Sequence, residues 1–217
     1  MTIAVLGTGS VGETIANRLL EVGHSVVMGS RSATNEKAAA WATGAGGNAS
    51  AGTFADAIAA GELLINATKG EVAIDIFANV PADSFAGKTL IDIANPLDFS
   101  NGMPPTLSTV NTDSFGEKLQ RTYPALHVVK SLNTMWAGLM VNPNLVANGD
   151  HTVFMSGNHA EAKAQTTALL QEFGWKPENI LDLGDISTAR GTEMLLPVWL
   201  RTWGALGTAA FNFKIVK

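Results

Sequence analysis

A glycine-rich turn near the amino terminus constrains the fold more than any other feature of the chain. The stretch "VLGTGSVG" places Gly7, Gly9 and Gly12 in a G-x-G-x-x-G pattern, directly after an apolar run and before an amphipathic segment. The first glycine permits the tight turn, the second lets the backbone approach a pyrophosphate, and the third lets the helix pack closely on the strand. Because N–H groups at a helix start attract anions, the turn predicts a dinucleotide site.

Apolar bursts of strand length alternate with segments of helical period along the chain. Strands are predicted at 3–6, 25–28, 63–67, 90–93, 126–130, 152–155 and 180–183. Helices are predicted at 11–22, 35–41, 54–60, 72–78, 113–122, 160–173 and from Ser187 onward. The stretch "GAGGNASAG", 44–52, fits a short edge strand better than a linker. The alternation predicts an α/β fold: Rossmann-like, doubly wound, with a mainly parallel sheet covered by helices on both faces.

The length of 217 residues suits one domain with a sizeable core. We expect residues 1–140 to form the dinucleotide-binding core of this single domain. Residues 141–217 would form a C-terminal α/β extension that ends in a long helix and completes the fold. This division predicts one dinucleotide-binding domain over 1–217 rather than two independent units.

Composition narrows the class of protein. The net charge of −5 argues against a general nucleic-acid surface, and the chain has neither a signal-peptide pattern nor an apolar run near the length of a membrane span. It lacks cysteine, and its four histidines show no metal-ligand spacing. We expect a cytoplasmic protein without nucleic-acid partner, membrane contact or metal.

The residues after the second predicted strand bear on which dinucleotide binds. An NAD site commonly carries an acidic residue there, which accepts hydrogen bonds from the ribose 2′-OH. Here "VVMGSRSATNEK", 26–37, offers Ser30 and Arg31, and no carboxylate precedes Glu36. A guanidinium binds phosphate bidentately, and a hydroxyl adds a further donor. The stretch predicts NADP(H), with Lys37 as a weaker third candidate. A solvated surface arginine is the alternative.

The sequence resembles a known family at this point. The segments "GTGSVG", "MGSR", "IDIANP" and "VVKSLNT" are similar to the NADPH-dependent oxidoreductases typified by the deazaflavin (coenzyme F-420)-dependent NADP reductases of archaea and actinobacteria. The cytosolic domain of the transmembrane ferric reductases resembles them more distantly. The terminal "ARGTEMLLPVWLRTWGALGTAAFNFKIV" resembles the family's closing helix, so the likeness covers nearly the whole chain. It implies an NADP-dependent oxidoreductase and a homodimer.

The resemblance also implies a role for particular residues. The pyrophosphate would be held by Thr8, Gly9, Ser10, Val11 and Gly12. The nicotinamide ribose would be bordered by Ala67, Thr68 and Lys69, and the nicotinamide face lined by Ala94, Asn95, Pro96, Asn133, Thr134 and Met135. These segments fall at predicted strand ends on one edge of the sheet, where such folds bind ligands.

Lys69 departs from the family pattern, which has an apolar or proline-containing turn there. The lysine either contacts a cofactor phosphate or ribose, or acts as a proton donor if burial lowers its pKa. The second role would point away from a deazaflavin acceptor.

Other acid–base candidates are few. Tyr123 is the only tyrosine, and no lysine lies four residues after it. Hydride transfer to a flavin-type ring needs mainly two stacked rings, whereas reduction of a carbonyl or imine needs a placed proton donor. The leading hypothesis is therefore hydride transfer between NADPH and a flavin-type or deazaflavin acceptor. The alternatives are a carbonyl or imine reductase that uses Lys69, and a non-catalytic NADP(H)-binding sensor.

The last segment carries an apolar stripe at helical spacing. Leu195, Trp199, Thr202 and Leu206 would share one face, and Pro197 would kink the helix or mark its start. Such a stripe is typical of a core or a subunit interface. In the functional interpretation, Leu206 and Phe211 help to cover a planar acceptor, so that 141–217 completes the acceptor pocket and provides dimer contacts.

Overall fold

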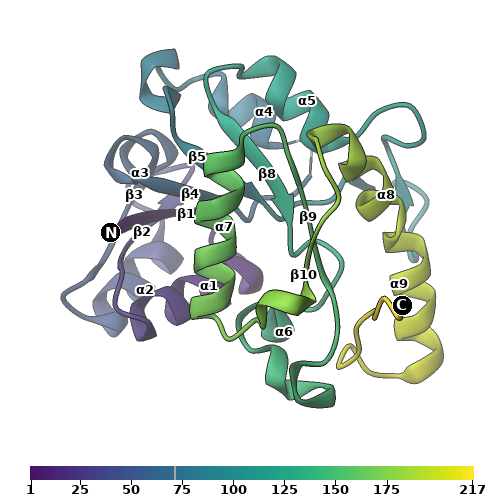
Figure 1. Cartoon of the computed structure of the whole chain (residues 1–217). Helices are drawn as coiled ribbons and strands as arrows, with labels where there is room; N and C mark the ends of the chain where they lie inside the picture. Colours follow the sequence, from purple (N-terminus) through teal and green to yellow (C-terminus); the bar gives the residue numbers. More distant parts are fainter. Residues whose placement is uncertain (71) are drawn as a thin grey trace.

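One mainly parallel sheet runs through the molecule (Figure 1). The computed structural model describes residues 1–70 and 72–217, and within them eight strands pair in the order β10-β9-β8-β5-β4-β1-β2-β3. The strands are β1 (Thr2–Leu6), β2 (Ser25–Ser30), β3 (Ala49–Thr53), β4 (Leu63–Asn66), β5 (Thr89–Asp92), β8 (His127–Ser131), β9 (Val153–Gly157) and β10 (Ile180–Asp182). Neighbours pair in parallel except β8 and β9, which are antiparallel. The predicted Rossmann-like class is confirmed.

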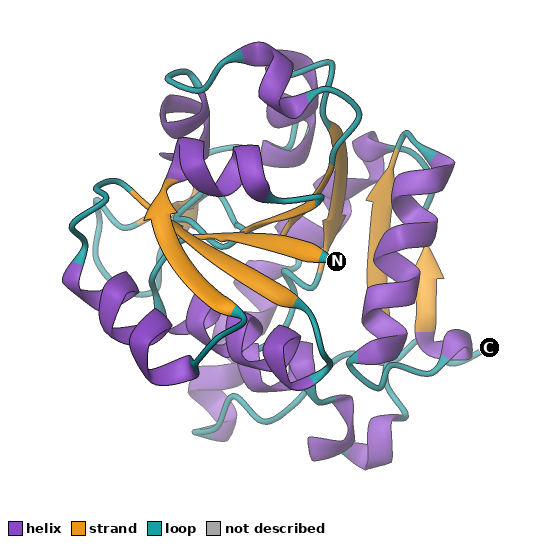
Figure 2. Cartoon of the chain, turned by 90° about the vertical axis from the view of Figure 1, so that its left-hand side faces the viewer, coloured by secondary structure: helices purple, strands orange, loops and turns teal. Residues whose placement is uncertain are grey.

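Helices cover both faces of this sheet, and Figure 2 shows the sheet lying between them. They are α1 (Ser10–Glu21), α2 (Glu36–Ala45), α3 (Phe54–Ala60), α4 (Val72–Phe77), α5 (Phe115–Thr122), α6 (Ala137–Val141), α7 (Ala160–Glu172), α8 (Ala189–Met194) and α9 (Leu196–Leu206). Short 3-10 turns are η1 (Ala82–Phe85), η2 (Pro143–Leu145), η3 (Ala147–Gly149), η4 (Pro177–Asn179) and η5 (Ile186–Thr188).

The two-sided burial follows from alternation along the strands. In β1, Ile3 and Val5 pack in a cluster with Ile15 of α1, and this cluster also takes in residues of α2, α6 and α7. The intervening Ala4 and Leu6 pack on the opposite face with α3, α4, α5 and α8. All four β1 side chains are fully buried, as expected for a strand covered on both sides.

Most predicted elements are present with ends shifted by one to a few residues. The edge strand expected within 44–52 is β3, which closes one side of the sheet. Helix α6 and the antiparallel pair β6 (Leu97–Asp98) and β7 (Thr106–Leu107) were not predicted, because these elements are too short to show a period. Strands β9 and β10, from the predicted extension, continue the same sheet as the core.

The C-terminal helical segment is divided rather than continuous. Pro197 lies in the first turn of α9, one of the two roles expected for it. Because proline has no N–H to donate to the preceding turn, α8 stops at Met194 and α9 starts at Leu196. The closing helix α9 therefore takes its own direction along the side of the molecule, and the chain ends beside it (Figure 1).

Two histidines stack at the opposite end of the sheet from the glycine turn. The rings of His127, which starts β8, and His159, which precedes α7, lie 3.8 Å apart. Burial, and then the proximity of His127, lowers the pKa of His159 below 6.5. The unfolded chain therefore binds a proton at His159 more readily than the folded protein does. The resulting stabilisation is present above the unfolded-state pKa and is lost as pH falls through the folded-state pKa.

We expect the substitution His159→Gln to weaken the pH dependence of stability. Urea denaturation at about pH 8 and about pH 5 should show a smaller loss of unfolding free energy in the variant than in the wild type, because glutamine does not titrate. His127→Gln should produce part of the same effect. Equal losses in wild type and His159→Gln would contradict the assignment.

Candidate functional site

The glycine turn after β1 has the geometry that an anion site requires. Gly7 has φ +127°, and a Cβ there would lie 2.6 Å from the carbonyl oxygen of Ala67. A Cβ on Gly12 would lie 2.3 Å from the Gly7 carbonyl, so only glycine lets α1 pack this closely. Around Gly9 nothing lies within 4 Å of a Cβ position, and no side chain caps the helix start. The α1 amides are thus open to a pyrophosphate beside Gly9.

Ser30 and Arg31 differ in how they present their polar groups. Ser30 is buried, and its hydroxyl donates to the carbonyl oxygen of Ser32 at 2.7 Å. Arg31 is exposed, and its guanidinium makes no ion pair within the part of the chain that the structure describes. The ammonium of Lys37 lies 4.0 Å from a carboxylate oxygen of Glu13. Arg31 is therefore the group best placed to receive a 2′-phosphate, while Ser30 shapes the loop.

Two hollows meet at the turn after β4. One, of about 270 Å³, lies beside the glycine turn and is lined by Gly7, Thr8, Ser30, Arg31, Asn35, Phe54, Ala67, Thr68, Lys69, Val72 and Ile76. The other, of about 330 Å³, is lined by Val11, Ala67, Thr68, Lys69, Gly70, Ile93, Ala94, Asn95, Leu97, Phe99, Asn133, Met135, Met140, Leu196 and Trp199. Residues 67–69 line both cavities, so the two cavities adjoin at this turn.

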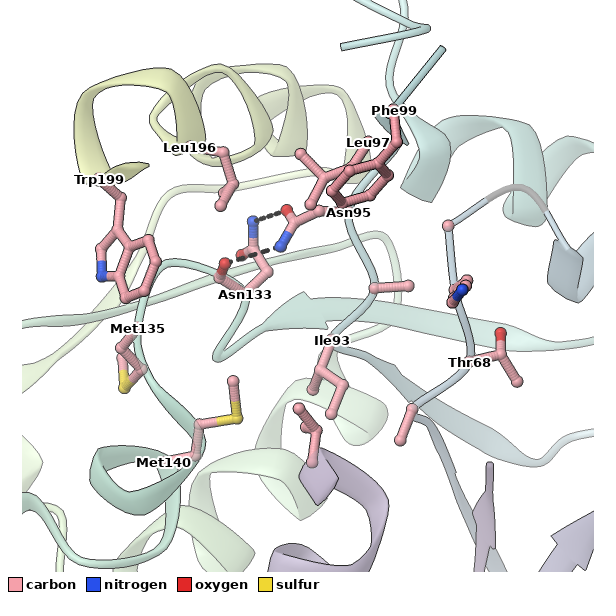
Figure 3. A pocket seen from close by; sticks show the side chains of 15 residues that line it. Thr68, Ile93, Asn95, Leu97, Phe99, Asn133, Met135, Met140, Leu196 and Trp199 are labelled. Carbon is pink, nitrogen blue, oxygen red and sulfur yellow. Dashed lines mark hydrogen bonds between the residues drawn. The ribbon is translucent and has the colours of Figure 1, made fainter. Parts of the chain in front are cut away.

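The polar side chains of the larger cavity are largely engaged with each other (Figure 3). The amide of Asn95 donates to the Asn133 carbonyl at 2.9 Å, and the Asn133 amide donates to the Asn95 side-chain oxygen at 3.0 Å. The Thr68 hydroxyl donates to the Asn66 side chain at 2.7 Å. The asparagine bonds fix the turns after β5 and β8 relative to one another, and the Thr68 bond fixes the turn after β4 on its own strand.

Apart from Lys69, the remaining walls of the cavity are apolar. Figure 3 shows Trp199 and Leu196 descending from α9, with Met135 and Met140 beneath them and Thr68 on the far side. The Trp199 ring stacks on Phe211, with centroids 5.5 Å apart. The recess is therefore suited to a flat, largely apolar ring system.

Several predicted site residues do not line this cavity. Thr134 and Pro96 are buried beside it, while Leu206 is 57% exposed and Phe211 lies behind Trp199. The sequence instead missed Ile93, Leu97, Phe99, Met140, Leu196 and Trp199 as lining residues. Trp199 appeared only as part of an apolar stripe, because the direction of α9 depends on the break after α8.

Lys69 is exposed and belongs to both hollows. The burial that a proton-donor role requires is lacking at this position. A solvated ammonium beside the expected pyrophosphate suits the phosphate- or ribose-contacting role.

The histidines lie away from the cavity. His24 pairs with Glu172 at 2.6 Å, and His151 lies between the Pro143 carbonyl and the Asn212 amide. Over residues 1–70 and 72–217, no three His, Cys, Asp or Glu side chains gather as a metal site would need. The helices in these same ranges are all too short or too polar to cross a membrane.

Comparisons with known proteins agree with this geometry. The family model of the coenzyme F-420-dependent NADP oxidoreductases matches residues 2–96. A crystal structure from Arthrobacter sp. FB24, provisionally named an F-420-dependent NADP-reductase, is 53% identical with a TM-score of 0.94, and the match covers 100% of both chains. An imine reductase from Bacillus cereus, 18% identical with a TM-score of 0.66 over 95% of this chain and 62% of that one, shares the fold alone.

A curated relative carries the same domain within a longer protein. The metalloreductase STEAP3 of Rattus norvegicus is 31% identical over 97% of this chain and 41% of its own length. The chain thus spans about two fifths of that relative. Together with the full-length match to the Arthrobacter protein, these similarities show that the chain belongs to the family of coenzyme F-420-dependent NADP oxidoreductases and is an NADP-dependent oxidoreductase.

Proposed function

We propose that this oxidoreductase transfers hydride between NADPH and a flavin-type or deazaflavin acceptor. The observation that carries the proposal is the lining of the larger of the two cavities, whose volume is about 330 Å³. The planar ring of Trp199 lines it, and most of the other lining side chains are apolar. Its two asparagines, Asn95 and Asn133, are hydrogen-bonded to each other, and a carboxamide offers no titratable proton. Such a recess provides stacking without proton transfer, which is what a ring-to-ring hydride transfer needs.

The residues present fit NADP(H). The α1 amides beside Gly9 would hold the pyrophosphate, and Arg31 would bind the 2′-phosphate. Lys69 would contact phosphate or ribose from the turn that joins the two hollows. When bound, the nicotinamide supplies the hydride.

The protein's own contribution at the acceptor end is positioning. Met135, Met140 and Leu196 would limit the access of water to the space beside Ala94, and Trp199 would offer an aromatic face. Holding two rings at short range in a dry recess replaces a chance encounter by a fixed geometry.

The first prediction concerns selection of NADP(H). Arg31→Asp should raise the dissociation constant for NADPH by about 100-fold, because a charge-assisted bond is replaced by repulsion. Ser30→Ala should change it by less than about threefold, since the hydroxyl is already bonded to the Ser32 carbonyl. Titration of NADPH followed by fluorescence measures both. Arg201→Asp, at an exposed arginine outside both hollows, is the matched charge control. Unchanged affinity in Arg31→Asp would overturn the assignment.

The second prediction concerns the acceptor. Purified protein is mixed with NADPH and, separately, with coenzyme F-420, FMN, FAD or a ferric chelate, while nicotinamide absorbance is followed. We expect turnover with a deazaflavin or flavin, because the cavity fits a planar ring. Tight NADPH binding without turnover of any acceptor would contradict the proposal and favour a non-catalytic NADP(H)-binding sensor.

The same assay tests the competing role of Lys69. Lys69→Ala should raise the KM for NADPH a few-fold and leave kcat nearly unchanged, because the lysine binds rather than donates a proton. A collapse of kcat together with turnover of a carbonyl or imine would instead establish the alternative reductase.

We also propose that a second copy of the chain covers the outer face of α9. Trp203 and Leu206 lie about one turn apart on this helix and are 41% and 57% exposed. Exposed apolar side chains in this arrangement are typical of an interface. Light scattering should give the mass of a dimer for the wild type and of a monomer for Leu206→Glu. Leu145→Glu, at a leucine 54% exposed in η2, should remain dimeric. A monomeric wild type would refute the dimer.

A further inference from the structure

A fully buried group of charges lies behind the acceptor cavity. Lys130 of β8 is 1% exposed, and its ammonium donates to Asp92 of β5 and Glu193 of α8, each at 2.8 Å. It also donates to the carbonyl oxygen of Ala94. An ammonium has three protons, so these bonds use its whole donor capacity.

Two carboxylates face one ammonium, and further hydrogen-bond donors stabilise the negative charge that Lys130 does not neutralise. Glu193 accepts from the backbone amides of Phe115 and Gly116, at 2.8 and 3.1 Å, in the first turn of α5. Asp92 accepts from the Asn66 amide at 2.8 Å. Burial by itself lowers the pKa of Lys130, but the charges of Asp92 and Glu193 outweigh it and raise the pKa above its ordinary value. Lys130 is thus held as an ammonium whose donors are all used.

Lys130, Asp92 and Glu193 are each connected to residues that line the cavity. The Ala94 carbonyl belongs to a lining residue, and Asn66 orients Thr68, which is another. On the α8 side, Glu193 lies three residues before Leu196, where α9 begins and the Trp199 wall starts.

Thr192, which precedes Glu193, is hydrogen-bonded to a residue that lines the same cavity. The carbonyl of Thr192 accepts from the Asn133 amide at 3.2 Å. Ion pairs and hydrogen bonds depend on direction, whereas apolar contacts tolerate sliding. A buried charge group therefore specifies the relative placement of the elements it joins more narrowly than an apolar contact would.

We propose that Lys130 and Glu193 are positioning residues, whose buried ion pair fixes α9 against the sheet and so sets the width of the cavity that receives the acceptor. The proposal rests on the proposed function for its kinetic consequence, but not for its structural one. The residues proposed to hold the adenosine end of NADP(H), Gly9 and Arg31, lie outside the group's contacts, so we expect the NADPH dissociation constant to change much less than the acceptor KM.

The variant Glu193→Gln tests this most cleanly. It keeps the side-chain volume and leaves Lys130 paired with Asp92, so the sheet retains a neutral pair. An amide group, however, turns one acceptor into a donor facing either Lys130 or the α5 amides. Asp182→Asn, which breaks the exposed pair with Lys163 at 2.7 Å, is the matched control.

Kinetics are measured well below the unfolding temperature of each protein. We expect Glu193→Gln to raise the KM for the acceptor by about tenfold while the NADPH dissociation constant stays within about twofold. Asp182→Asn should match the wild type in both. An unchanged acceptor KM in folded Glu193→Gln, or an equal rise in both constants, would overturn the proposal, because a merely structural role predicts one of these outcomes.

Hydrogen exchange gives a readout that does not need turnover. Amides of 196–206 should exchange faster in Glu193→Gln than in the wild type, whereas those of 10–21 in α1 should not change. Uniform acceleration, or none, would overturn the positioning role. If the wild type turns over no acceptor, the proposed function fails by itself, and exchange alone decides this inference.

Discussion

The parallel pairing of β1, β2, β4, β5 and β8 is the constraint on which the rest of the structure depends. Neighbouring parallel strands end at the same edge of a sheet, so the turns that follow them all lie along that edge. The glycine turn, Arg31, the turn at 67–69, Asn95 and Asn133 lie along that edge because of this pairing. Helices on both faces leave the edge as the open side.

In the proposed function, selection of the hydride carrier and reception of the acceptor fall to different parts of this edge. Carrier selection would depend on the backbone geometry at Gly7 and Gly12 and on Arg31, which forms no ion pair with any described residue. Reception would depend on apolar walls contributed by α6 and α9, which come from a different part of the chain. A family with one carrier and varied acceptors is consistent with that division, because the walls can change without disturbing the glycine turn.

Charge is buried at the place where these two parts meet. Lys130, Asp92 and Glu193 join two strands and α8 in the interior of the molecule. Burying charges is unfavourable unless partners satisfy them, and here α5 amides and Asn66 complete the set. Apolar contacts would let α8 slide on the sheet, whereas these directional bonds give it a defined orientation.

The sequence by itself determined the sheet-forming strands, the glycine turn and the preference for NADP(H), because each depends on local period or on neighbouring residues. Through family resemblance it also predicted turns that line the cavity, including Asn95 and Asn133. Tertiary structure alone decided that Ser30 turns inward while Arg31 forms no ion pair with any described residue, and that Trp199 rather than Leu206 lines the cavity. Those outcomes depend on side-chain partners far away in sequence and on the direction α9 takes after Pro197, and neither leaves a local periodic signal.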